Sequence, residues 1–164
     1  QLVTNSVTIT DWETTKIIDF DISATLSAGG KTLIEFNANA DAVATDAGVL
    51  TATGALDLDT ATDNDILLVL NSTTNINTTD ALETALEFGG TYQLKNAAGA
   101  MAVGDTFLVA YDDGANSYIS MVTSNSVIAA DSFFGSGTLD AVQIIQLTGV
   151  AAATSVVTGD IILS

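Results

Sequence analysis

The clearest pattern in the sequence is an alternation of hydrophobic and polar positions over 105–111, which is typical of a β-strand. It places on one face the residues Phe107, Val109 and Tyr111. A second such run covers 118–122, and the acidic segment between the two contains an Asp-Gly pair that favours a turn. The two runs therefore predict a β-hairpin in which Tyr111 and Tyr118 face each other across the strands.

A continuous hydrophobic run over 65–71, bounded by polar residues, predicts a strand that is buried on both faces. Weaker hydrophobic runs predict further short strands, which cover 3–10, 16–20, 32–37, 49–58, 141–147 and 155–163. The segments 38–48 and 71–79 are rich in Ala, Thr, Asp and Asn, as expected of loops over a β scaffold.

One segment, over about 80–88, carries the signals of a helix. Asp80 is a favourable N-cap, and Glu83 follows three positions later, in the manner of a capping box. Leu82 and Leu86 lie one turn apart on one face, and a pair of glycines follows as a stop signal. The sequence thus predicts a mainly β fold, a β-sandwich or β-roll-like domain of short strands, with one short helix near 80–88. We expect 1–164 to form a single β-rich domain, with 71–79 as the candidate point for a subdivision.

Composition limits the classes of partner. The net charge is −17, yet 48% of the residues are hydrophobic, which is enough to build a core. Such an acidic protein repels phosphates and anionic lipids, so we expect no nucleic acid partner. No apolar run is long enough to span a bilayer, and we expect no membrane insertion. The start at Gln1 lacks the features of a signal peptide, so we expect a processed product or a fragment of a longer chain.

The sequence offers few groups for catalysis. It contains no His, Cys or Arg, so a Ser or Thr nucleophile would have only Lys or a carboxylate as its base. Nothing in the spacing of the glutamates singles out a catalytic pair, and a solvated helix face explains Glu83 and Glu87. We therefore expect no enzymatic activity and no catalytic residues.

Metal binding is the sharper hypothesis. Asp57, Asp59, Asp63 and Asp65 crowd into the loop before a buried strand, and calcium prefers several hard carboxylate oxygens. The spacing does not fit an EF-hand, and the alternative is a solvated acidic loop that precedes the strand. These four aspartates are the predicted calcium ligands.

Three further residues have two readings each. Asp112 and Asp113 are turn formers or, alternatively, calcium ligands. Trp12 is a packing residue or an aromatic that stacks on a ligand, and no glycan can be named from the sequence.

The two ends of the chain resemble a known family. The segments GDTFLVAYDDGANSYISMV, DAVQIIQLTGV and VVTGDIILS are similar to the C-terminal region of bacterial RTX-type proteins that are exported by type I secretion. ITDWETTKIIDFDIS is similar to the boundary after the last repeats of such proteins. The family includes adhesins, surface-layer proteins and large calcium-binding surface proteins, so the resemblance implies an extracellular, cell-surface location. The calcium nonapeptide of the family is absent, so its calcium-filled β-roll does not carry over to this chain.

The sequence supports two candidate functions. The first is a structural protein that associates with itself as a subunit of a surface layer or filament. The segments 3–10 and 155–163 are apolar and lack Lys and Pro, which normally guard a sheet edge, so we expect a homo-oligomer or polymer that forms through edge strands. The alternative is a monomeric C-terminal secretion or adhesion module of a larger, type I-secreted calcium-binding surface protein.

Overall fold

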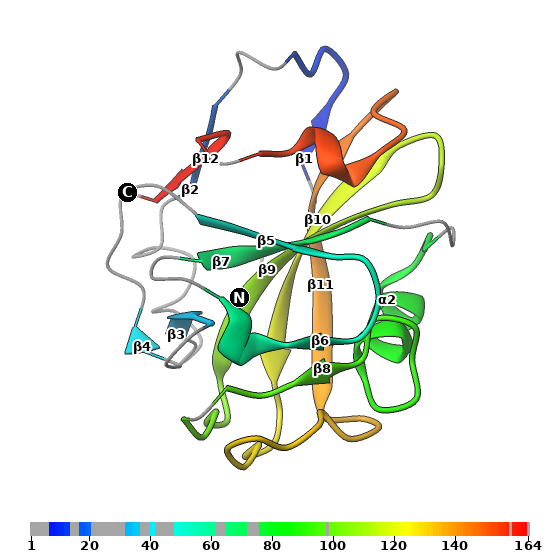
Figure 1. The fold of residues 1–164 in the computed structure, drawn as a ribbon. Coiled ribbons are helices and arrows are strands. Elements are labelled where there is room, and N and C mark those ends of the chain that lie inside the picture. The colour runs from blue at the N-terminus through cyan, green and yellow to red at the C-terminus, as the bar shows by residue number, and fades with distance from the viewer. Residues whose placement is uncertain are drawn as a thin grey trace.

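The computed structural model describes residues 7–13, 17–20, 32–36, 40–41, 48–61, 65–71, 76–97, 99–157 and 159–163. An eight-stranded sheet is its central element (Figure 1). The strands of this sheet are β1 (Val7–Ile9), β3 (Thr32–Glu35), β4 (Ala40–Asp41), β5 (Gly48–Ala52), β7 (Asp65–Leu70), β9 (Asp105–Asp112), β10 (Ser117–Ser124) and β11 (Leu139–Leu147). The mainly β fold with a short helix, predicted from the sequence, is confirmed.

The strand order along the sheet is β1-β11-β10-β9-β3-β4. β9 pairs with β7 in addition, and β7 pairs with β5. The antiparallel pairing of β9, β10 and β11 forms the middle of the sheet, whereas β1, β3, β5 and β7 are held through parallel pairs. The predicted hairpin is confirmed, because Tyr111 pairs directly with Tyr118 across β9 and β10.

Smaller elements cover this sheet. Two of them are two-stranded parallel sheets, formed by β2 (Ile18–Phe20) with β12 (Ile161–Leu163) and by β6 (Leu56–Asp57) with β8 (Leu94–Lys95). The others are the helix α2 (Thr79–Leu86) and the 3-10 turns η2 (Leu58–Thr60) and η3 (Ala153–Ser155). Among the described residues, no helical segment has both the length and the hydrophobicity of a membrane span.

Both faces of the sheet are buried, as the continuous hydrophobic run of β7 predicted. On one face the side chains of β7 and β9 join those of α2 and β8 in a cluster that we call the helix-side core, which includes Leu68, Leu70, Leu82, Leu86, Leu94, Phe107, Val109 and Tyr111. On the other face they join those of β2, η3 and β12 in the ribbon-side core, which includes Ile18, Leu67, Val69, Leu108, Ala110, Ala153 and Ile161. The segments before and after 71–79 therefore share the helix-side core.

A β-bulge lets β11 contribute to both cores. Leu139 and Ala141 lie in the helix-side core, whereas Ile145 and Leu147 lie in the ribbon-side core. Strict alternation would place all four on one face, but the β10–β11 register shifts between Ile119 and Ser120. One extra residue in a strand moves every later side chain to the opposite face.

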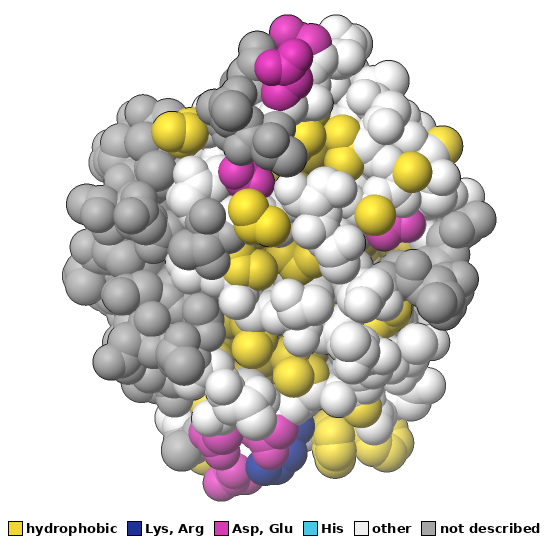
Figure 2. Space-filling view, turned by 45° about the horizontal axis from the view of Figure 1, so that its top comes forward, with side chains coloured by type: hydrophobic (Ala, Val, Ile, Leu, Met, Phe, Trp, Pro, Cys, Tyr) yellow, Lys and Arg dark blue, Asp and Glu magenta, His cyan; other side chains and the backbone are white. Residues whose placement is uncertain are grey.

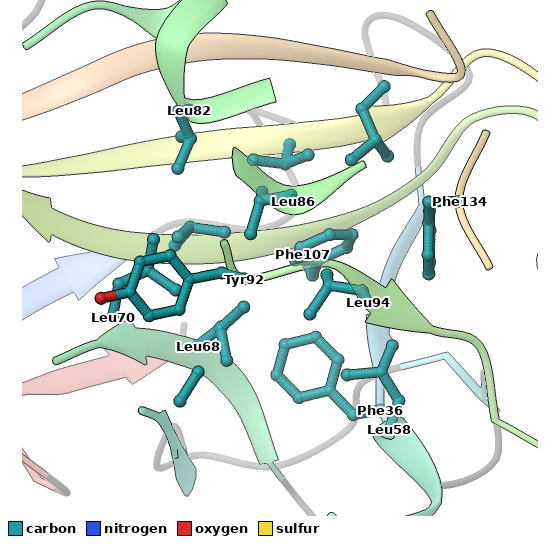
Figure 3. Packing of buried hydrophobic residues seen from close by; sticks show 14 of the residues in the cluster. Phe36, Leu58, Leu68, Leu70, Leu82, Leu86, Tyr92, Leu94, Phe107 and Phe134 are labelled. Carbon is teal, nitrogen blue, oxygen red and sulfur yellow. The ribbon is translucent and has the colours of Figure 1, made fainter. Parts of the chain in front are cut away.

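A chain of aromatic rings runs through the helix-side core (Figure 3). Phe107 lies between Phe36 and Phe134, with ring centroids 5.4 Å and 6.4 Å away in edge-to-face geometry. All three rings are fully buried. Each ring buries a large apolar area, and the edge-to-face contacts add about 0.5–1.5 kcal/mol per pair.

The helix is where predicted, but its start was assigned wrongly. Thr78 is the N-cap, and its Oγ1 accepts a hydrogen bond from the Ala81 amide at 3.1 Å. Asp80 lies in the first turn. No capping box forms, because the third helical position after Thr78 is Ala81, and Glu83 instead accepts the Ala141 amide. The stop is as predicted, since Gly89 follows the helix with a φ of 88°.

Two other expected strands were partly wrong. The segment 49–58 is divided between β5 and β6. The segment 155–163 begins in the turn η3 and becomes a strand only at β12, because Asp160 first closes a tight turn by accepting the Val157 amide at 2.9 Å. Residues 3–6, 16, 37–39, 42–47, 72–75 and 158 of the predicted strands and loops lie outside the described residues.

Candidate functional site

The predicted calcium loop holds two of its four aspartates in a defined arrangement. Asp57 ends β6 and caps η2, where its Oδ1 accepts the Asp59 amide at 3.1 Å, and Asp59 is exposed. Asp63 lies outside the described residues, as does the side chain of Asp65, whose backbone begins β7. Within the described ranges no group of three or more acidic side chains is arranged to hold a metal ion. Calcium binding by this loop stays a prediction.

A lysine that the sequence analysis did not connect to this loop binds Asp57. Lys95 Nζ lies 2.7 Å from Asp57 Oδ2 and 3.1 Å from Asp131 Oδ1, so one ammonium joins two carboxylates. The hydrogen bond from Lys95 lowers the pKa of Asp57, and the hydrogen bonds to Asp57 and Asp131 raise the pKa of Lys95. The pairing of β6 with β8 brings these residues together across 38 positions of sequence.

The acidic turn of the hairpin uses its carboxylates to build the turn. Asp113 Oδ1 accepts the amides of Ala115 and Asn116 at 2.8 and 2.7 Å, and its Oδ2 accepts the Tyr118 hydroxyl at 2.6 Å. The bond from Tyr118, followed by those from the backbone, lowers the pKa of Asp113 to about 2. The geometry agrees with the turn-forming reading of this residue.

The same turn holds the segment after β11 in place. Asp112 is buried, and its Oδ2 accepts the Ala153 amide at 3.2 Å. Asn116 Oδ1 accepts the Gly149 amide, and Ser117 Oγ donates to the Val150 carbonyl at 2.7 Å. These contacts fix η3 against the sheet, so the polar side chains of the turn have a structural role.

Helix carboxylates cover part of the outer edge of β11. Glu83 Oε1 accepts the Ala141 amide at 2.7 Å, while Glu87 Oε1 accepts the amides of Thr138 and Leu139 at 2.9 and 3.2 Å. Burial raises the pKa of Glu83, against the effect of the Ala141 amide, and nearby acidic side chains raise it further. The solvated helix face expected for Glu83 and Glu87 is therefore wrong, because both are drawn onto the sheet.

The remaining outer edge of β11 is covered by β1, which is itself the last strand in the sheet order. Ile9 faces β11, since its carbonyl accepts the Thr148 amide at 2.8 Å. Backbone groups of successive residues point to opposite edges, so Thr8 presents its amide and carbonyl away from β11. Val7 is 58% exposed, and Thr8 is exposed too. β1 is thus a short edge strand without a lysine or proline to guard it.

Two aromatic side chains form an exposed pair that the sequence analysis did not identify. The ring centroids of Phe88 and Phe133 lie 5.4 Å apart, and the side chains are 66% and 44% exposed. Acidic and lysine side chains gather at the lower edge of Figure 2, with hydrophobic side chains next to them. The sequence pattern does not predict that these two side chains are exposed, because a phenylalanine usually packs in a core.

Trp12 agrees better with its packing reading. The side chain is partly buried and packs against the ribbon-side core. Its Nε1 is shielded from solvent and has no hydrogen-bond partner among the described residues.

Comparison with known proteins identifies no relative: no protein-family model, no curated protein and no solved structure matches the chain.

Proposed function

We propose that this chain is an extracellular structural module of a bacterial cell surface that associates with copies of itself through an exposed strand edge. The observation that carries the proposal is the geometry of β1. It ends the strand order, it presents Thr8 outward, and it has no charged side chain within Val7–Ile9. A second chain can satisfy the outward backbone groups by adding a strand.

The coverage of β11 supports β1 as the point of contact. Glu83 and Glu87 occupy the amides at the beginning of β11, so a second chain has no access to that part of the edge. At the other end of the strand, β1 lies between β11 and any incoming chain. Association at this side of the sheet therefore has to proceed through β1.

Charge opposes the contact, because each copy carries a net charge of −17. Salt shortens the screening length to about 10 Å near 0.1 M, and divalent cations bridge carboxylates, so both should strengthen assembly. The external medium supplies such ions, which fits the extracellular location that the RTX-type resemblance implies. The lack of His, Cys and Arg supports a structural role over a catalytic one.

The second candidate is the monomeric module of a larger, type I-secreted surface protein. It is favoured by the pairing of β12 with β2, because β12 then finds a partner for its backbone hydrogen bonds inside the same molecule. Sedimentation of the chain with and without calcium distinguishes the two functions. Oligomers or polymers are expected for the structural subunit, and a monomer under all conditions would favour the module.

A further inference from the structure

Phe88 and Phe133 form the most exposed aromatic contact in the described part of the molecule. Large apolar side chains that lie together on a surface mark interaction sites, because removing their apolar surface from water is favourable when a partner covers them. Here two rings with centroids 5.4 Å apart present 66% and 44% of their side chains to solvent.

Hydrogen bonds fix the backbone at both phenylalanines. The Phe88 amide donates to the Phe134 carbonyl at 2.7 Å, and Phe133 forms an antiparallel bridge with Lys95. Phe134 itself is fully buried against Phe107, and Glu87, next to Phe88, is bound to two amides. The backbone that carries the two rings is therefore fixed, so a partner that covers them does not have to order this part of the chain.

Carboxylates border the aromatic pair. Asp131 lies two residues before Phe133, and Lys95, the bridge partner of Phe133, joins Asp131 to Asp57. Two carboxylates share one ammonium, so this border keeps a net negative charge. Asp131 has a side chain that is 61% exposed and remains open to a further cation.

We propose that the Phe88–Phe133 surface binds a cationic, apolar polypeptide segment of another protein. An arginine or lysine would lie over a ring face and pair with Asp131, since cations are attracted to aromatic faces, and its apolar neighbours would cover the rest of the pair. Charge complementarity selects this occupant. Among the described residues a second copy offers Lys95 as its cation, and that ammonium is already engaged by two carboxylates.

The test uses two synthetic peptides of equal length and charge, one of alternating arginine and leucine and one of alternating arginine and glycine. Binding to the full chain is measured by calorimetry at neutral pH and low salt. The Phe88→Ser, Phe133→Ser double variant removes the rings, and Asp131→Asn removes the charge. Val157→Ser is the matched control, since Val157 is 50% exposed and lies next to Val156 of the ribbon-side core on the opposite face of the sheet.

The wild-type chain should bind the leucine-containing peptide about tenfold more tightly than the glycine-containing one. The double variant should lose this preference, Asp131→Asn should weaken the binding of both peptides, and Val157→Ser should change neither. Equal binding of both peptides, or a preference that survives in the double variant, would overturn the proposal in favour of general charge attraction. Self-association that Phe88→Ser abolishes would also overturn it, by assigning the surface to a second copy.

Discussion

The rings of Tyr111 and Tyr118 stack across the β9–β10 hairpin, with centroids 5.4 Å apart and 27° between their planes. Each hydroxyl has its own partner: that of Tyr111 pairs with Ser120 Oγ at 3.0 Å, and that of Tyr118 donates to Asp113 at 2.6 Å. The stacked pair thus links the helix-side core to the acidic turn. Because this turn also holds η3, the hairpin organises both faces of the sheet.

Tyr118→Phe removes the hydroxyl that Asp113 accepts, and we expect it to lower stability by about 1 kcal/mol at neutral pH. The folded-state pKa of Asp113 is about 2, below the ordinary 3.8. The stability that the ionised carboxylate contributes is therefore present above pH 3.8 and is lost as the pH falls toward 2. In the variant this acid-dependent loss should be smaller, as measured by urea unfolding across the same pH range. Tyr111→Phe is the control, and it should keep the acid dependence because the hydroxyl that it removes pairs with Ser120.

Glu83→Gln should stabilise the protein at neutral pH. The folded-state pKa of Glu83 is raised above its ordinary value, so its ionisation costs stability as pH rises through the folded-state pKa. Glutamine keeps an oxygen that accepts the Ala141 amide but carries no charge. The gain should vanish in acid. Glu83→Ala should be destabilised by about 1 kcal/mol in acid because the amide loses its acceptor, and by less at neutral pH, where the variant also lacks the cost of the ionised carboxylate. A Glu83→Gln protein that is less stable than the wild type at neutral pH would contradict this account of the helix.

Phe134→Ala should destabilise the protein by about 3–5 kcal/mol, since it opens a cavity beside Phe107 in the helix-side core. Phe88→Ala should cost far less, because the side chain is mostly exposed. Chemical denaturation of both variants measures the difference. Similar losses would mean that Phe88 supports the fold, which is against its assignment to an interaction surface.

The elements that the sequence predicted well depend on neighbours in the chain. The β9–β10 hairpin and the buried strand β7 follow from local alternation and from a continuous hydrophobic run. The helix start was missed by two residues because Thr78 and Asp80 are both favourable caps, and the extended conformation of Thr78 decides between them.

The contacts that could not be predicted join distant positions. Glu83 binds an amide 58 residues away, and Lys95 binds Asp57 and Asp131 at separations of 38 and 36 residues. No local pattern carries such pairs, since they depend on how β6, β8 and α2 pack on the sheet. The exposure of Phe88 is a tertiary property for the same reason.

If calcium binds at the Asp57–Asp65 loop, the Asp59→Ala, Asp63→Ala double variant should lose the binding, as measured by calorimetry. Lys95→Met should instead strengthen it, because the ammonium that occupies Asp57 Oδ2 competes with the metal ion. Asp131→Asn is the control, since it removes the other carboxylate from Lys95 and leaves the loop intact. Binding that survives in the double variant would place the calcium site elsewhere.

The most direct test of self-association is sedimentation velocity of the intact chain over a range of concentrations, in calcium and salt, beside a Val7→Lys variant. We expect the wild type to form oligomers or polymers and the variant to stay monomeric, because an edge lysine blocks strand addition. The substitution also reduces the net negative charge, which on its own would favour association. Val127→Lys makes the same charge change at a side chain that is 70% exposed, and it should still assemble. A wild-type chain that remains monomeric at high concentration in calcium and salt would contradict the account.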